Sequence, residues 1–330
     1  MKAIVAPGQG AQRPGLLSPW LDVPGVGQQL GELSEAAELD LVDVGTNWDA
    51  DAIRPTEIAQ PLVVASALVA ARFLETHGVR PDVVAGHSVG EWAAAVLAGV
   101  LTESEAMRLV SVRGRSMAQA CAVAPTGMSA VLGGDRDEVL SALATHGLVA
   151  ANDNGGGQIV AGGPIDALDA FAAAAPEGAR VRRLEVAGAF HTPAMRPAVA
   201  PLAAAATTAT FSPATLPFLS NCDGGLIDAE QADGGLASDG ADILARLVYQ
   251  VASPVRWDLC TETLRDFEIT SFIELMPAGT LTGLAKRSLP GVATVALNTP
   301  DDLEKVRAIY ETANEQVTIN EFQQVAAGVR

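Results

Sequence analysis

Cysteine is scarce in this chain of 330 residues. The three cysteines, Cys121, Cys222 and Cys260, are odd in number and far apart, so neither a disulfide framework nor a zinc site of closely spaced thiolates is indicated. A reducing compartment suits such a chain, and we therefore expect a cytoplasmic protein that uses no metal.

Long hydrophobic runs are also missing. The longest apolar stretch, Trp92 to Leu101, has about half the length that a bilayer-spanning helix needs. Near the N-terminus, a short apolar run stops at Pro7-Gly8, before it reaches the length of the hydrophobic region of a secretory signal. The sequence therefore predicts neither a transmembrane segment nor a signal peptide.

The chain has few positively charged residues. Lysine and arginine number 21 against 39 aspartates and glutamates, which gives a formal net charge of −18. Such a charge repels phosphate backbones and anionic lipids, so we expect no nucleic-acid partner and no membrane partner. The hydrophobic content of 49% is enough for one large core, or for a large and a small domain in one chain. A small molecule or a protein is the expected partner.

The most informative motif is Gly86-His87-Ser88-Val89-Gly90, a G-x-S-x-G between an apolar run (83–85) and a strongly helical run (91–98). A serine on a tight strand-to-helix turn is presented outward, and the backbone amides and the helix N-terminus then face any developing negative charge. Ser88 is therefore a candidate nucleophile. The alternative is a glycine-rich turn between a strand and a helix, with no catalytic role.

Strands and helices alternate along the chain. A strand at 2–6, an apolar helix at 61–75 and a strand at 83–85 that enters the serine motif predict an α/β fold with a parallel sheet. After Pro125 the order becomes β-α-β-β-α-β, the ferredoxin-like pattern. These six elements are expected at 128–132, 135–145, 148–152, 158–161, 164–175 and 181–186.

We therefore predict two domains. Residues 126–187 form a small ferredoxin-like domain inserted into a larger α/β domain made of 1–125 and 188–330. The chain returns to the larger domain through a helical run at 200–206, a stretch rich in proline and glycine up to Gly240, and a strand near 271–275.

A nucleophilic serine needs a base, and the chain offers four histidines. His77 and His146 each precede a glycine where a helix is expected to end, a position that the helix dipole explains. His87 adjoins Ser88, and consecutive side chains in a turn diverge. His191, on a loop just after the inserted domain, is left as the candidate base; the alternative for it is a solvated loop side chain.

Arg113 is the second informative position. Thr102-Glu103-Ser104-Glu105 matches a capping box, which predicts a helix from there towards Gln119. Arg113 shares one face of that helix with the apolar residues Ala106, Leu109, Val110 and Met117. A guanidinium on an apolar face needs an anion or several acceptors. The spacing leaves two interpretations open: a structural salt bridge to a core carboxylate, or a clamp for a substrate carboxylate.

Taken together, six motifs resemble those of the malonyl-CoA:acyl carrier protein transacylase family, in the family's order, over roughly residues 3 to 300. They are the run 7–12 (PGQGAQ), the run 86–91 (GHSVGE), Arg113, Asn154 with 157–160 (GQIV), the run 190–192 (FHT), and Gln250 before 253–257 (SPVRW). The resemblance implies an α/β-hydrolase-like core with an inserted ferredoxin-like subdomain.

The resemblance also implies the catalytic roles. Ser88 would be the nucleophile and His191 its base, with the backbone carbonyl of Gln250 orienting the imidazole. The backbone amides of Gln9 and Val89 would form the oxyanion hole.

Substrate contacts follow from the same resemblance. Arg113 would pair with the malonyl carboxylate, and Phe190 before the base resembles the malonyl-selective form of that motif. Gln60 and Asn154 match family positions near the pocket, although hydrogen bonding within a turn or cap explains them equally well.

The implied reaction moves a malonyl group from malonyl-CoA to the phosphopantetheine thiol of an acyl carrier protein, for fatty-acid or polyketide synthesis. A serine ester splits this exchange into two steps, so ping-pong kinetics follow, and the chain itself needs no cofactor. Carrier proteins are acidic, as is this chain, so a local basic patch must compensate. The candidates are 180–183 and 286–287, for which an ordinary solvated face is the alternative.

Two other functions are weighed against this one. An α/β-hydrolase esterase or thioesterase would carry an acidic triad member between Ser88 and His191 and an HGGG-type oxyanion loop; no such loop occurs, and most of the intervening acids fall in the expected inserted domain. A non-catalytic module that docks carrier proteins would not need Ser88, His191 and Arg113 together. Smaller departures from the family pattern, Ala6 and the run 276–279 (MPAG), touch none of the proposed chemistry.

Overall fold

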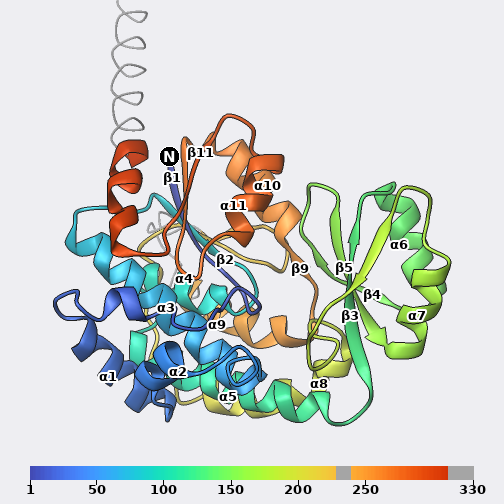
Figure 1. Ribbon diagram of the computed structural model, residues 1–330, viewed down its shortest axis with the longest axis horizontal. Helices are drawn as coiled ribbons and strands as arrows, with labels where there is room; N and C mark the ends of the chain where they lie inside the picture. The colour runs from blue at the N-terminus through green and yellow to red at the C-terminus, as the bar shows by residue number, and fades with distance from the viewer. Residues whose placement is uncertain (228–238, 311–330) are drawn as a thin grey trace, which may run out of the picture.

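Two β-sheets lie side by side in the computed structural model, which describes residues 1–227 and 239–310 (Figure 1). The larger sheet has the strand order β11-β10-β1-β2-β7-β8. Neighbouring strands are parallel except for β7 and β8. The strands are β1 (Lys2–Ala6), β2 (Val83–Gly86), β7 (Phe218–Leu219), β8 (Leu226–Ile227), β10 (Ser271–Glu274) and β11 (Ala293–Ala296). The predicted α/β class with a parallel sheet is confirmed.

Helices cover both faces of the larger sheet (Figure 1). Successive residues of a strand point to opposite faces, so Ile4 packs into one apolar cluster and Val5 into the other. The cluster around Ile4 includes side chains of α1 (Val26–Ala37), α2 (Leu41–Asn47), α3 (Thr56–Thr76), α4 (Gly90–Leu97), α5 (Glu103–Cys121), α8 (Arg196–Ala206) and α9 (Asp239–Tyr249). The cluster around Val5 includes those of α10 (Trp257–Asp266) and α11 (Thr280–Ser288).

The helix α3 starts earlier than the sequence predicts. It begins at Thr56 after Pro55, and Pro61 lies inside it rather than at its start. By length and composition α3 could cross a membrane, but 78% of its apolar window is buried inside the protein. Short 3-10 turns complete the helical elements: Ser18–Trp20, Pro193–Met195, Gln250–Ala252 (η3) and Pro300–Asp302.

The smaller sheet has the strand order β6-β3-β5-β4-β9. Its strands are β3 (Thr126–Leu132), β4 (Val149–Asp153), β5 (Gln158–Pro164), β6 (Arg180–Arg183) and β9 (Val255–Arg256), and the helices between them are α6 (Arg136–Thr145) and α7 (Ile165–Ala173). The last expected strand ends at Arg183 rather than Val186. The strand β9 comes from the segment after 188, so the two parts of the chain share this sheet.

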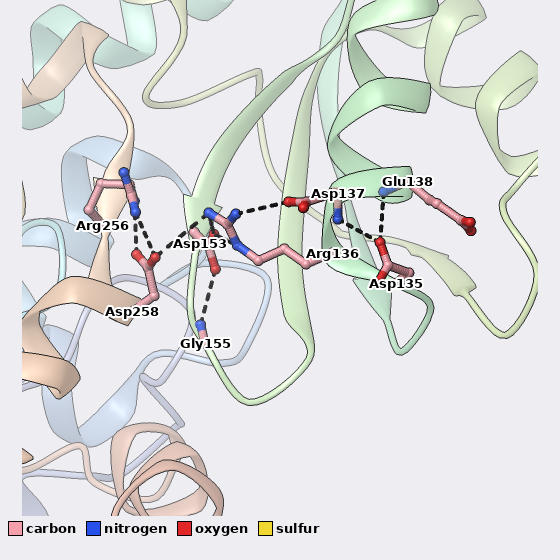
Figure 2. A network of polar contacts seen from close by, with 8 residues as sticks. All are labelled: Asp135, Arg136, Asp137, Glu138, Asp153, Gly155, Arg256 and Asp258. Atoms are coloured by element: carbon pink, nitrogen blue, oxygen red, sulfur yellow. Dashed lines mark hydrogen bonds and ion pairs between the residues drawn. The ribbon is translucent and has the colours of Figure 1, made fainter.

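A polar network joins the smaller sheet to α10 (Figure 2). Arg136, at the start of α6, donates through Nε to Asp153 Oδ2 at 2.9 Å, and its Nη2 lies 3.9 Å from Asp258 Oδ2. Arg256 holds the same Asp258 with two hydrogen bonds of 2.9 and 2.7 Å. These contacts fix the smaller sheet against the first turn of α10. Two segments of the expected larger domain lie outside the described residues: 228–238 and 311–330. The first of them belongs to the expected stretch rich in proline and glycine up to Gly240.

Candidate active site

The turn between β2 and α4 places Ser88 at the end of the central strand. Ser88 has φ of +54°, in the left-handed region, as expected for a nucleophile elbow. A Cβ on Gly86 would lie 2.1 Å from the carbonyl carbon of Gly90, and a Cβ on Gly90 would lie 2.3 Å from the oxygen of Ala6. Both glycines of the motif are therefore required by space, because β2, α4 and β1 meet at this turn.

The structure brings Ser88 and His191 together. Ser88 Oγ lies 2.7 Å from His191 Nε2, across a gap of 103 residues in sequence. On the other side of the ring, Nδ1 lies 2.9 Å from the backbone oxygen of Gln250, at the start of η3. A carbonyl oxygen can only accept, so Nδ1 carries the proton and Nε2 is left to accept one from Ser88. Ser88 Oγ, the imidazole of His191 and the backbone oxygen of Gln250 therefore form a continuous chain of hydrogen bonds.

The imidazole of His191 is buried and uncharged. Burial is the main cause that lowers its pKa from the ordinary value of 6.5 to about 3, and the charge of Arg113 lowers it further. The hydrogen bond to Gln250 acts in the opposite direction. An imidazole in this state can take up a proton during a reaction without holding one beforehand.

Arg113 reaches the same point from α5. Its guanidinium is buried and donates through Nη1 to Gln60 Oε1 at 2.7 Å, and through Nη2 to Gln250 Oε1 at 2.8 Å and Ser88 Oγ at 3.3 Å. Its Nε has no hydrogen-bond partner within residues 1–227 and 239–310. In that part of the chain no carboxylate lies within ion-pair distance of Arg113. The structural salt bridge considered from the sequence is not what holds this arginine.

Two buried residues of the site, Asn221 and Glu91, are given no role by the sequence patterns. Asn221, just after β7, accepts from Ser88 N at 2.8 Å and donates to Gly86 O at 2.7 Å, which fixes both sides of the turn. Glu91, the last residue of the GHSVGE run, accepts from Asn221 N at 2.7 Å and from Gln250 Nε2. Asn221 stands in no recognisable motif, and only the position of Glu91 next to the serine motif could have drawn attention to it.

A cleft of about 860 Å³ lies between the two sheets and opens onto Ser88 and His191. Its walls include Gln9, Gln60 and Phe190 beside Ser88 and His191, all of which the sequence predicts for the site. The carbonyl oxygen of the Gln9 side chain accepts from Gln60 Nε2 at 3.3 Å.

The remaining predicted positions lie next to the cleft. Val89 is fully buried and directly precedes α4. Asn154 is not among the cleft-lining residues; its Oδ1 lies 2.8 Å from His87 Nε2, and its Nδ2 donates to Gln158 at 3.2 Å. The contact with Gln158 is local, whereas the contact with His87 joins Asn154 to the serine motif across 67 residues. No group of three or more metal-binding side chains occurs in the described ranges.

Comparison with known proteins shows which family the chain belongs to. The family model for the acyl transferase domain matches residues 4–299. The malonyl CoA-acyl carrier protein transacylase of Mycobacterium tuberculosis is 48% identical over 93% of this chain and 99% of its own length, and that of Bacillus subtilis is 30% identical over 92% and 95%.

Solved structures agree with the sequence comparison. The crystal structure of MCAT from Mycobacterium tuberculosis superposes with a TM-score of 0.85 at 48% identity and covers 92% of this chain and 99% of that one. An acyl carrier protein S-malonyltransferase from Vibrio cholerae gives a TM-score of 0.84 at 31% identity, with coverage of 92% and 99%. The chain therefore belongs to the acyl transferase domain family, among the malonyl CoA-acyl carrier protein transacylases.

Proposed function

We propose that this protein transfers a malonyl group from malonyl-CoA to the phosphopantetheine thiol of an acyl carrier protein, and so supplies extender units for fatty-acid or polyketide synthesis. One observation supports malonyl as the acyl group. A buried guanidinium lies 3.3 Å from the hydroxyl of a serine–histidine pair, and its described hydrogen-bond partners are all uncharged. A carboxylate at the end of the acyl chain is the chemistry that such an arginine is suited to bind.

In the first step, Ser88 Oγ attacks the thioester carbonyl of malonyl-CoA while His191 Nε2 takes the hydroxyl proton. The tetrahedral intermediate collapses, the carbon–sulfur bond breaks, and His191 returns the proton to the departing CoA thiolate. The product is a malonyl ester on Ser88. The 2.7 Å contact between Oγ and Nε2 supports direct proton transfer.

In the second step, the carrier thiol gives its proton to His191 and attacks the ester, and Ser88 recovers that proton as it leaves. The backbone amides of Gln9 and Val89 would hold the oxyanion in both steps, a contribution of about 2.7 to 4 kcal/mol per donor in one measured case. The carbonyl of Gln250 would stabilise the imidazolium through Nδ1. No cofactor on this chain enters either step.

Two residues would select the acyl group. Phe190, in the cleft wall, would restrict the space beside the base. Arg113, which donates to Ser88 Oγ, would bind the malonyl carboxylate. Gln60, which accepts from Arg113, would fix the guanidinium, whereas Asn154 would act through its contact with His87.

The proposed fold details follow the family. The larger domain, residues 1–125 and 188–330, would be an α/β-hydrolase-like core, and residues 126–187 a ferredoxin-like subdomain; the order β6-β3-β5-β4 of its own four strands supports this. Arg182 and Arg183 lie in the cleft wall, where they would meet an acidic carrier. We expect the protein to work in the cytoplasm.

Steady-state transfer tests the proposed function. With malonyl-CoA and a carrier protein bearing phosphopantetheine, we expect malonyl-carrier to form much faster than acetyl- or methylmalonyl-carrier from the corresponding CoA esters. Release of free malonate at the same rate with and without carrier would instead indicate a thioesterase. Carrier binding without any acyl transfer would indicate a docking module.

Replacing Arg113 by Ala should shift the acyl preference. The lost charge-assisted hydrogen bonds contribute roughly 1.5 to 3 kcal/mol each, so kcat/KM for malonyl-CoA should fall roughly tenfold to a hundredfold more than that for acetyl-CoA. Arg113→Lys should recover only part of the loss, because an ammonium cannot reproduce the planar fork. An equal fall in kcat/KM for both esters, together with a large drop in Tm, would mean that Arg113 has a structural role only.

The low pKa of His191 predicts an unusual pH profile. Because only the neutral imidazole accepts the serine proton, and its pKa lies at about 3, the acylation rate should stay level as the pH is lowered from about 7 to about 5. The measurement is the burst of CoA release from malonyl-CoA at each pH. A rate that halves near the ordinary histidine pKa would contradict the buried, neutral base.

A further inference from the structure

The side chain of Gln250 connects the guanidinium to a buried carboxylate. Its Oε1 accepts from Arg113 Nη2 at 2.8 Å, and its Nε2 donates to Ser88 O at 3.0 Å and to a carboxylate oxygen of Glu91. The same residue orients His191 through its backbone oxygen. Gln250 is therefore shared between the base and the arginine.

Glu91 is one of three groups that set which way the Gln250 amide points, together with Ser88 O and Arg113. One oxygen of Glu91 accepts from the backbone N–H of Asn221 and the other from Gln250 Nε2, so each carboxylate oxygen has a donor in front of it. A flipped Gln250 amide would place its oxygen against the carboxylate and its NH₂ group against the N–H donors of Arg113. Both contacts would be repulsive. Glu91 therefore helps Ser88 O and Arg113 to keep Oε1 pointed towards the guanidinium.

Glu91 lies close to Arg113 without touching it. Glu91 and Arg113 are both buried, and the amide of Gln250 lies between them. Burial raises the pKa of Glu91 to about 8 and lowers that of Arg113 to about 9, and in each case the charge of the other group opposes the shift. Since its direct partners Gln60, Gln250 and Ser88 are neutral, the guanidinium is held in place but not neutralised by a bonded carboxylate.

We propose that Glu91 is a positioning residue for acyl selectivity: it locks the Gln250 amide, and through that amide it holds Arg113 ready for the malonyl carboxylate. The inference rests on the proposed function, because it concerns how malonyl is preferred over acetyl. Glu91 does not contact the reacting atoms. It acts through Gln250 and Arg113, and its other contact, with Asn221 N, supports the serine turn.

The test is the ratio of kcat/KM for malonyl-CoA to that for acetyl-CoA. In Glu91→Gln the new amide offers one oxygen and one NH₂ group, so it cannot accept from both Asn221 N and Gln250 Nε2. We expect the ratio to fall about tenfold, the size of one hydrogen bond to a charged group, while acetyl transfer falls less.

A matched control exists in α5. Glu103 is also a shielded carboxylate that accepts from a glutamine, Gln29 Nε2 at 3.0 Å, and faces an arginine, Arg72 Nη2 at 2.6 Å. It lies outside the cleft-lining residues. Glu103→Gln should leave the malonyl-to-acetyl ratio unchanged, even if it lowers the Tm.

A double-mutant cycle with Gln250→Ala separates positioning from general destabilisation. Gln250→Ala keeps the backbone oxygen that orients His191 but removes the amide, so it should lower the ratio by itself. In that background Glu91→Gln should lower the ratio no further. If Glu91→Gln does not fold, the malonyl-to-acetyl ratio of Gln250→Ala remains as the test, and an unchanged ratio overturns the proposal.

The outcomes are distinct. A wild-type enzyme with no preference for malonyl-CoA contradicts the proposed function itself. A wild-type preference that survives in Glu91→Gln, or in Gln250→Ala, overturns the role of Glu91. A full additional loss from Glu91→Gln in the Gln250→Ala background also overturns it, because Glu91 would then act by another route.

Discussion

Ser88→Ala should abolish both the covalent malonyl adduct and transfer to the carrier. The hydroxyl oxygen of Ser88 is the atom that forms the ester, so no other group can replace it. We therefore expect kcat to fall by about 10⁴-fold or more, on the scale seen when the nucleophile of a serine enzyme is removed. The measurement is intact mass after brief exposure to malonyl-CoA, together with the rate of transfer.

Ser66→Ala is the control for this variant. Ser66 is also buried, in α3, where its hydroxyl donates to Leu62 O at 2.7 Å rather than to a base. That variant should still gain one malonyl group. An adduct that formed on Ser88→Ala would mean that the nucleophile is elsewhere.

His191→Ala should slow acylation and transfer by about 10² to 10⁴-fold, the usual contribution of a positioned general base. Neither step can move its proton efficiently without Nε2, which lies 2.7 Å from Ser88 Oγ. Single-turnover rates with malonyl-CoA measure the first step, and chase with carrier measures the second.

The other histidines provide matched controls. In His77 and His146, Nδ1 lies 2.8 Å from a backbone oxygen of the preceding helical turn, at the ends of α3 and α6. His77→Ala and His146→Ala should therefore be close to neutral in catalysis. Near-normal turnover by His191→Ala at neutral pH would require a different base.

The sequence predicted the parts of the site that local rules determine. Ser88 could be found because a strand, two glycines and a helix leave one conformation for the turn, and the structure places it at φ +54°. Arg113 could be placed inward because its helix has one apolar face, and it is buried. His191 was reached by elimination among four histidines, and the structure brings it to Ser88.

The parts that depend on long-range packing could not be predicted. Asn221 belongs to the site only because the segment after β7 packs beside the serine turn. Glu91 meets Asn221 and Gln250 for the same reason, and no sequence spacing encodes these contacts. The joining of β9 to the smaller sheet has the same cause. The early start of α3 was missed because Pro61, expected near a helix start, is tolerated inside this one.

The most direct test of the proposed malonyl transfer through Ser88 is a chase experiment with the isolated enzyme. The protein is exposed to malonyl-CoA, freed of CoA, mapped by peptide mass spectrometry, and then mixed with carrier bearing phosphopantetheine. We predict that one malonyl group is found on the peptide containing Ser88 and that it moves to the carrier thiol. Loss of the group as free malonate, with none on the carrier, or a malonyl group on a peptide without Ser88, would contradict the account.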